Sequence, residues 1–187
     1  HSSFEKSLER LGLDFVDLLL IHAPSRTVPI EESIRAMNEL QERGVVHHIG
    51  VSNFTVNQTR EAMDASSTPI LTNQVEYHPF KPRNELLEFC VENNLALTAY
   101  TPLANSRVSR NETLREIGEL YQKSPQQVAL RWLVQQPMVC TIPKASDPDH
   151  QQENLKVFDF ELTDNEMERI FELGGGLIRT VRNLLDF

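Results

Sequence analysis

Five short apolar segments alternate with amphipathic segments along the chain. The first expected strand, residues 16–22, is almost uniformly apolar and ends in a histidine. A continuous apolar run of this length is typical of a strand that is covered on both faces of a parallel sheet. The other expected strands are residues 48–54, 70–75, 95–100 and 138–142. The alternation predicts parallel strands joined by right-handed crossovers.

The segments between these strands carry apolar residues at helical spacing. Helices are expected at residues 3–11, 55–65, 82–94, 112–123 and 125–135, after Pro29, and from Thr163 to Leu173. Ser124 before Pro125 is a typical N-cap followed by proline at the first helical position. A short helix is also expected from Pro148, and its N-terminus is a candidate to hold an anion.

The pattern favours a (β/α)8 TIM barrel over a doubly wound fold, because no Gly-rich dinucleotide turn occurs. Such a barrel has eight strands in about 250 residues, whereas this chain shows five in 187 residues. We therefore expect residues 1–187 to form a single, incomplete barrel domain with open sheet edges. The start at His1, without methionine and inside a helical pattern, also favours the carboxyl-terminal part of a larger barrel. An apolar tail, residues 174–187, would either cover the barrel mouth or pack on the outer helices.

Composition narrows the functional classes. Hydrophobic residues make up 40% of the chain and charged residues 24%, as in ordinary globular proteins. No apolar run approaches the ~20 residues of a membrane-spanning helix, and no signal peptide is recognisable, so a cytoplasmic location is expected. The formal net charge of −9 argues against nucleic-acid or anionic-membrane partners. Cys90 and Cys140 are expected to be buried thiols.

Polar residues stand where the expected strands end, and this is where α/β barrels place their chemistry. His22 is therefore a candidate site residue, although its ring could instead donate to a backbone carbonyl. The adjacent His47 and His48 suggest no metal site, because neighbouring strand residues point to opposite faces. We expect no metal.

The five strand exits form a set of motifs. They read His22-Ala23-Pro24, Gly50-Val51-Ser52-Asn53-Phe54, Asn73-Gln74-Val75-Glu76-Tyr77-His78-Pro79, Ala99-Tyr100-Thr101-Pro102-Leu103 and Ile142-Pro143-Lys144. In this order and spacing they resemble the aldo-keto reductase family, and most of all its prokaryotic diketogluconate-reductase-like members. The resemblance extends over residues 7–162.

The resemblance implies the reduction of aldehydes and ketones by direct hydride transfer from a nicotinamide cofactor. It implies that His22 donates a hydrogen bond to the substrate carbonyl. It also implies a set of cofactor-binding positions. Ser52, Asn53 and Gln74 match the residues that hold the nicotinamide carboxamide, and Tyr100 matches the aromatic that stacks on the nicotinamide ring.

The loops after the last two strands match the remainder of the cofactor site. The positions are Thr101, Pro102, Leu103, Lys144, Ala145, Ser146, His150, Glu153 and Asn154. The resemblance implies that Lys144 contacts the adenosine 2′-phosphate and that Glu153 and Asn154 recognise adenine. His150 stands where many NADP-preferring members carry arginine, and Ala145 where a hydroxyl residue is usual. NADPH is thus the preferred cofactor by a small margin, with NADH as the alternative.

The family's proton donor is a tyrosine beside a lysine and an aspartate, all from strands that precede the histidine strand. Neither Tyr77 nor Tyr121 can be assigned that role. Three hypotheses remain open: the carboxyl-terminal part of a carbonyl reductase that is inactive alone, a catalytically dead nucleotide-binding module or subunit, and a barrel of another family, such as an isomerase, with His22 as a base. The substrate, a small carbonyl compound in the first case, and the oligomeric state are left open.

Overall fold

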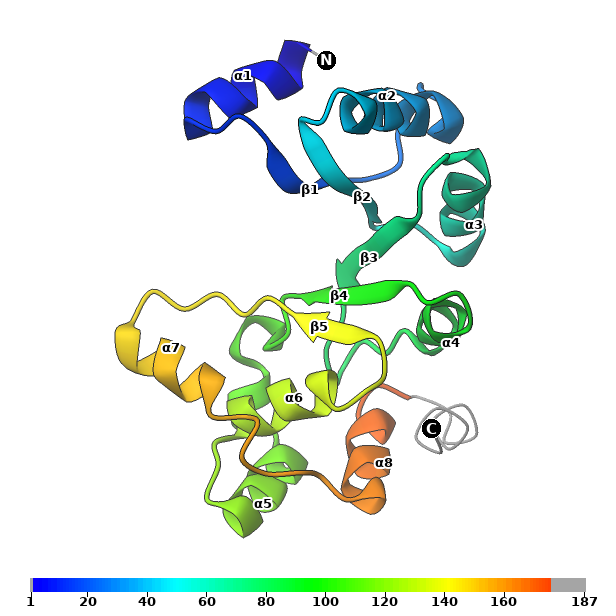
Figure 1. Cartoon of the computed structure of the whole chain (residues 1–187). Coiled ribbons are helices and arrows are strands. Elements are labelled where there is room, and N and C mark those ends of the chain that lie inside the picture. The colour runs from blue at the N-terminus through cyan, green and yellow to red at the C-terminus, as the bar shows by residue number, and fades with distance from the viewer. Residues whose placement is uncertain (1, 176–187) are drawn as a thin grey trace. The chain divides into compact units, whose positions relative to one another are not determined.

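The computed structural model describes residues 2–175, and its helices and strands alternate as the sequence predicts (Figure 1). The sheet has five strands in the order β1-β2-β3-β4-β5. Pairing is parallel between β1 and β2, β2 and β3, and β4 and β5. Contacts divide the chain into two compact units, one ending at Gln74 and the other beginning at Val75. The apolar tail from residue 176 onward lies outside the described residues.

The first unit contains three helices and a three-stranded segment of the sheet. Its elements are α1 (Ser2–Leu11), β1 (Val16–Ile21), α2 (Ile30–Glu42), β2 (Val46–Ser52), α3 (Val56–Ala65) and the first part of β3 (Ile70–Glu76). Helix α2 packs against both β2 and α3. Ile34, Ile49, Val51 and Ala62 have no exposed surface and form the core of this unit.

Strand β1 differs from the expectation of a strand covered on both faces. It is the outer strand of the sheet, and Leu18 is 39% exposed. The register pairs Leu18 with His48 of β2, which is also exposed, so both lie on one uncovered face. Within the first unit, no helix or strand covers this face. The open edge itself was expected of a partial barrel.

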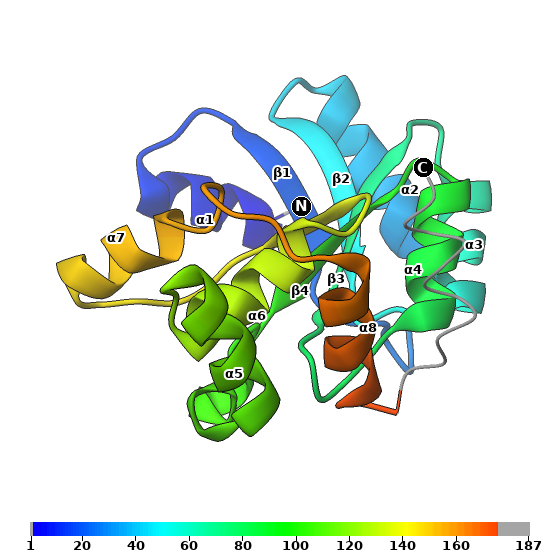
Figure 2. The ribbon, with the colours of Figure 1, turned by 90° about the horizontal axis from the view of Figure 1, so that it is seen from below.

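The second unit is built around helix α6. Its elements are α4 (Asn84–Glu92), β4 (Ala96–Tyr100), α5 (Glu112–Tyr121), α6 (Pro125–Val134), β5 (Val139–Thr141), α7 (Pro148–Leu155), α8 (Asp164–Glu172) and two short 3-10 helices, η1 (Ala104–Ser106) and η2 (Val108–Arg110). Helices α5, α6 and α8 lie together (Figure 2). Trp132 of α6 is fully buried, with ring centroids 5.2 Å from Tyr77 and 4.8 Å from Phe171.

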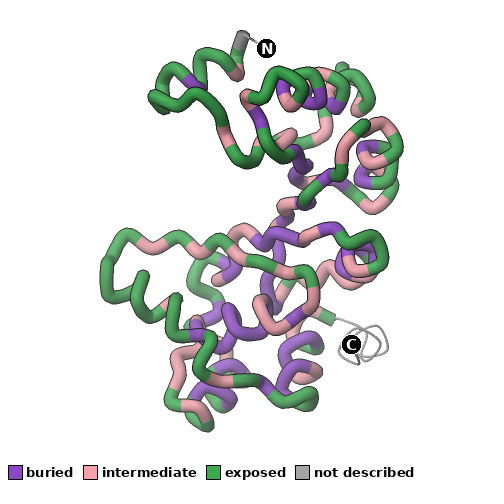
Figure 3. The backbone as a smooth tube through the Cα atoms, in the orientation of Figure 1, coloured by how far each residue is buried: buried purple, intermediate pink, exposed green. Residues whose placement is uncertain are grey.

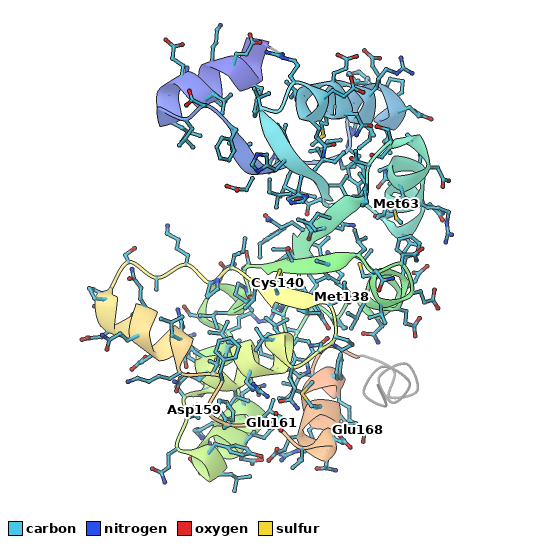
Figure 4. All side chains as sticks on the ribbon, in the orientation of Figure 1. Met63, Met138, Cys140, Asp159, Glu161 and Glu168 are labelled. Carbon is cyan, nitrogen blue, oxygen red and sulfur yellow. The ribbon has the colours of Figure 1, made fainter. Side chains whose placement is uncertain are left out.

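Helix α7 stands apart from this core. It has no buried residue, whereas most of α6 is buried (Figure 3). Asp159 and Glu161 lie in the segment after α7 (Figure 4). Two ion pairs hold this segment, Lys123 with Asp159 at 2.7 Å and Arg131 with Glu161 at 3.3 Å. These contacts hold the chain that leads from α7 to α8.

The two cysteines differ in exposure. Cys90 in α4 is buried as expected, but Cys140 in β5 is exposed (Figure 4). Strand β5 has three residues and is the other outer strand of the sheet. The prediction for Cys140 is therefore wrong, because it assumed a covered strand. Within residues 2–175 no helix is long and apolar enough to cross a lipid bilayer.

Candidate active site

Three strand exits in the first unit are joined by a hydrogen-bond network. Ser52 Oγ donates to the Gln74 carbonyl at 2.8 Å, and the Asn53 backbone N–H donates to the same carbonyl at 2.9 Å. The Asn53 side-chain amide donates to the His22 carbonyl at 3.1 Å and to Ser52 Oγ at 3.1 Å. The network brings four of the predicted positions together at the carboxyl ends of β1, β2 and β3.

Asn53 makes this network through an unusual backbone conformation. Its φ is 60°, in the left-handed region that asparagine tolerates better than most residues. The turn ends β2 and directs both the backbone N–H and the side-chain amide of Asn53 toward neighbouring exits. An asparagine at this position therefore serves the turn and the network together.

His22 takes part in the network only through its backbone. The residue is exposed, and among residues 2–175 its ring forms no hydrogen bond or ion pair. Within the described part of the chain, the His22 ring therefore donates no hydrogen bond to a backbone carbonyl, which was the alternative role expected for it. The ring is available to a ligand.

Sequence reasoning missed one residue that shapes this site, Asn73 in β3. Asn73 is fully buried, and its side-chain amide donates to the Phe54 carbonyl and to Thr59 Oγ1, both at 2.9 Å. These bonds hold the segment after Asn53 and the start of α3 against β3. The available signal was the run of three polar residues, 72–74, inside a strand that is otherwise apolar.

In the second unit the segment after β4 is held in a strained conformation. Tyr100 ends the strand and is half-buried; Thr101 has φ of 52°, and Pro102 is buried. Asn105 and Ser106 also have positive φ, 51° and 71°. Non-glycine residues in this region cost about 1–2 kcal/mol each, so the surrounding contacts must fix the segment.

Two contacts fasten this segment at its far end. Val108 has no exposed surface, and the Arg107 guanidinium lies 4.6 Å from the centre of the Phe80 ring. Phe80 belongs to the turn that follows β3, so the exits of β3 and β4 within this unit support each other.

A cavity of about 290 Å³ lies beside the strained segment. It is lined by Leu103, Ser106, Gln126, Lys144, Ala145, Ser146, His150, Glu153 and Asn154. Seven of these residues are positions that the family resemblance assigns to the cofactor site. The structure thus gathers them, from the exits of β4 and β5 and from α7, around one cavity.

The polar side chains of this cavity are uncommitted. Within the described residues, the side chains of Lys144, Ser146 and His150 form no hydrogen bond or ion pair. A lysine ammonium and a hydroxyl suit a phosphate group, and the Asn154 amide can pair with the edge of a base. This donor set fits a phosphorylated adenine nucleotide.

Two glutamines that sequence reasoning did not single out position α7 at the cavity. Gln127 of α6 is buried, and its amide donates to the Glu153 carbonyl at 3.0 Å and to the Lys156 carbonyl at 3.3 Å. Gln151 donates to the Ala145 carbonyl at 3.0 Å. The Gln127 contacts join residues 26 and 29 positions apart, which a linear pattern does not predict.

The N-terminus of α7 cannot hold an anion in the way the sequence suggested. Asp147 Oδ1 accepts the N–H groups of Asp149 at 2.8 Å and of His150 at 3.4 Å. The Gln151 N–H donates to the Asp147 carbonyl at 3.0 Å, and Pro148 has no N–H. Every N–H of the first turn is therefore used, and a carboxylate already occupies the position.

Neither Tyr77 nor Tyr121 is placed as a proton donor. Tyr77 is fully buried, donates to Gln136 Oε1, and has a pKa raised by burial. The hydroxyl of Tyr121 donates to Glu166 Oε2 at 2.6 Å, and this bond raises the pKa of Tyr121 to about 12. Both phenols are thus committed to structural hydrogen bonds.

The histidines of β2 have no ligand set around them. The His47 ring stacks on Phe15 with centroids 4.4 Å apart. Among residues 2–175, no three side chains of histidine, cysteine, aspartate or glutamate come together as metal ligands.

Reductases are among the curated proteins that are similar to this chain. The chain is 40% identical over 175 residues to 9,11-endoperoxide prostaglandin H2 reductase of Trypanosoma cruzi (strain CL Brener), covering 92% of this chain and 61% of that protein. It is 40% identical over 176 residues to 2,5-diketo-D-gluconic acid reductase B of Corynebacterium sp. (strain SHS752001), covering 93% and 63%. The chain thus spans about three fifths of the length of these relatives.

Solved structures share the fold. A thermostable aldo-keto reductase in complex with the inhibitor epalrestat matches with a TM-score of 0.89 and 40% identity, over 92% of this chain and 65% of that chain. An aldo/keto reductase from Brucella melitensis matches with a TM-score of 0.84 and 36% identity, over 92% and 66%. The fold is accordingly that of a TIM barrel, of which the described residues contain five strands.

The family model named "Aldo/keto reductase family" matches residues 1–174. The match extends through both units and includes every strand exit described above. Together with the network at the exits of β1 to β3 and the cavity beside α7, it gives the chain its classification: the protein belongs to the aldo/keto reductase family.

Proposed function

We propose that this chain carries the carbonyl-orienting histidine and most of the nucleotide site of an NAD(P)H-dependent reductase of small aldehydes and ketones. The observation that carries the proposal is the cavity around Lys144, whose polar side chains are free of partners among the described residues. The network that joins Ser52, Asn53 and His22 supports it. A cytoplasmic location, where reduced nicotinamide nucleotides are regenerated, goes with this proposal.

The reduced nicotinamide ring would supply the hydride to the carbonyl carbon. The residues of this chain would bind the cofactor and orient the carbonyl substrate. The His22 ring donates a hydrogen bond to the carbonyl oxygen, which polarises the carbonyl group and fixes its direction. Ser52, Asn53 and Gln74 hold the carboxamide of the nicotinamide, and Tyr100 stacks on its ring.

The adenosine half would bind in the second unit. Lys144 pairs with a phosphate as a point charge, with Ser146 as a neighbouring donor. Glu153 and Asn154 present an acceptor and an amide to the adenine edge. The strained segment that contains Thr101, Pro102 and Leu103 is then the wall of the nucleotide site, and Lys144 favours NADPH over NADH.

Fluorescence titration with NADPH and NADH tests the proposal. We expect saturable binding that weakens about tenfold in Tyr100→Ala, since an aromatic stacking contact contributes about 0.5–1.5 kcal/mol. Tyr121→Phe is the matched control, because this tyrosine lies in α5 and bonds Glu166; it should bind normally. A folded protein that binds neither nucleotide would contradict the proposal.

A second candidate function is nucleotide binding without reduction. Its support is that Tyr77 and Tyr121 are both committed to structural hydrogen bonds, and we infer that the proton donor does not come from either. Aldehyde-dependent oxidation of NADPH, measured on a polypeptide that also carries the upstream strands of the barrel, separates the two candidates, because both expect no turnover from residues 1–187 alone. Steady turnover supports the reductase, whereas binding without turnover supports the module.

A further inference from the structure

The segment that leads into α7 has an unusual charge balance for a phosphate-binding site. Lys144 is its one lysine, whereas Asp147, Asp149 and Glu153 contribute three carboxylates. Lys144 forms no ion pair within the described residues. Within the described residues, none of these three carboxylates is therefore paired with Lys144.

Asp147 holds the most constrained of these carboxylates. Its Oδ1 accepts the N–H groups of Asp149 and His150, so the carboxylate is fixed at the first turn of α7. His150 itself lines the cavity. Asp147 thus follows one residue of the cavity wall, Ser146, in the sequence, and its carboxylate is hydrogen-bonded to another, His150.

This cap reverses the usual electrostatics of a helix start. The N-terminus of a helix attracts anions through its free N–H groups and its dipole. In α7 the N–H groups are already bonded, and a full negative charge offsets the dipole. A second anion that approaches this turn meets repulsion, whereas a neutral hydroxyl does not.

We propose that Asp147 is a specificity-determining residue that lowers the affinity of the cavity for a 2′-phosphorylated adenosine and so narrows the preference for NADPH over NADH that Lys144 gives. The proposal rests on the proposed function, because it assumes that Lys144 faces the 2′ position of the bound nucleotide. Lys144 attracts the phosphate and Asp147 opposes it. The free 2′-hydroxyl of NADH is neutral and loses nothing to Asp147.

Calorimetric titration with adenosine 2′,5′-bisphosphate and with 5′-AMP tests this on the complete polypeptide. The two probes differ only in the 2′-phosphate and need no nicotinamide contact. Asp147→Asn removes the charge and keeps the cap, since asparagine caps a helix as well as aspartate. We expect the bisphosphate to bind about fivefold more tightly in Asp147→Asn, and 5′-AMP to change by less than about twofold.

Asp149→Asn is the matched control. It removes the same charge from the same turn, but the Asp149 side chain makes no hydrogen bond within the described residues and is free to turn into solvent. We expect about a twofold change or less for the bisphosphate, and a smaller Asp147→Asn effect at 0.5 M salt than at about 0.1 M.

The possible outcomes distinguish a failure of the proposed function from a failure of the proposal for Asp147. If the unsubstituted protein binds neither probe and neither dinucleotide, the proposed function fails and this inference with it. If the nucleotides bind but Asp147→Asn leaves the bisphosphate-to-AMP ratio unchanged, or changes it no more than Asp149→Asn does, the inference is overturned and the proposed function stands. Unfolding curves for both variants check that the cap survives.

Discussion

The side-chain amide of Asn53 donates a hydrogen bond to the backbone carbonyl of His22, at 3.1 Å. This bond crosses from the exit of β2 to the exit of β1. The same amide also donates to Ser52 Oγ. The backbone from which the His22 ring projects is therefore fixed by a side chain that lies 31 positions further along the chain.

Removing this amide should loosen the site without breaking the turn. Asn53→Gly keeps the positive φ of 60°, because glycine adopts it freely. We expect a loss of about 1–2 kcal/mol in the free energy of unfolding, from the lost hydrogen bonds, and roughly tenfold weaker NADH binding. Urea denaturation and fluorescence titration measure the two effects.

Asn53→Ala is the companion variant, since it loses the same amide and adds strain. Alanine at this φ costs about 1–2 kcal/mol more than glycine. If the alanine and glycine variants proved equally stable, the backbone at position 53 would not be held in the left-handed region.

A second prediction concerns acid stability and His78. His78 is 5% exposed; its Nδ1 accepts the Phe80 N–H at 3.2 Å, and its Nε2 lies 3.5 Å from Glu76 Oε1. Burial lowers the pKa of His78, with smaller contributions of the same sign from Arg107 and Lys81 and an opposing one from Glu76. The folded state thus binds this proton less readily than the unfolded state. Stability from His78 is present above pH 6.5, the ordinary value, and is lost as the pH falls below it.

His78→Asn should remove this dependence, because the asparagine oxygen can replace Nδ1 as the acceptor for Phe80. We expect the free energy of unfolding to fall less between pH 7 and pH 5 in the variant than in the unsubstituted protein. Glu76 titrates in a separate range, since the hydrogen bond from Lys81 lowers the pKa of its carboxyl below 4.5. Parallel pH profiles for the two proteins would refute the assignment to His78.

A third prediction concerns the alkaline side. The hydrogen bond to Glu166 raises the pKa of Tyr121 from 10.0 to about 12, so the folded state keeps this proton more firmly than the unfolded state. Its stabilising contribution is present below pH 10 and is lost as the pH rises from 10 to 12. We expect unfolding curves of Tyr121→Phe to change less over this range. The difference in phenolate absorbance between the unsubstituted protein and Tyr121→Phe follows the titration of Tyr121, and a difference that appears near pH 10 in the folded state would contradict the prediction.

Much of the fold follows from local patterns in the sequence. The caps Thr55, Ser124 and Thr163 begin three helices with reciprocal hydrogen bonds to a Gln or Glu three residues later, and such signals lie within four residues. The apolar runs likewise predict all five strands. Their faces were harder to predict, since β1 and β5 have the composition of covered strands and yet form the sheet edges.

For the candidate site too, some features could be predicted from the sequence and others could not. Ser52 and Asn53 stand out in the sequence as a polar pair at a strand exit, whereas the residues around Lys144 were predicted from the family resemblance. The contacts that hold them are not local. Asn73 reaches Phe54 and Gln127 reaches Glu153, and only the fold brings these pairs together. The sequence analysis predicted the start of the helix at Pro148, but it did not predict that the Asp147 carboxylate caps this helix.

The last prediction concerns position 150. His150 is exposed, lines the cavity, and offers no guanidinium fork for a phosphate. We expect His150→Arg to raise the affinity for adenosine 2′,5′-bisphosphate about tenfold, since a bidentate charged pair contributes about 1.5–3 kcal/mol. Binding of 5′-AMP should stay the same, and His150→Gln, with no added charge, is the control.

The arginine should act more strongly when Asp147 is neutral. Asp147 Oδ1 accepts the N–H of residue 150, so its carboxylate lies within reach of an arginine introduced there and competes with the phosphate for it. We therefore expect the gain from His150→Arg to be several-fold larger in the Asp147→Asn background than alone, a coupling typical of neighbouring charges. A double-mutant cycle of calorimetric titrations measures it. Simple additivity of the two substitutions would mean that the Asp147 carboxylate keeps its hydrogen bonds to the α7 backbone and does not pair with the introduced arginine.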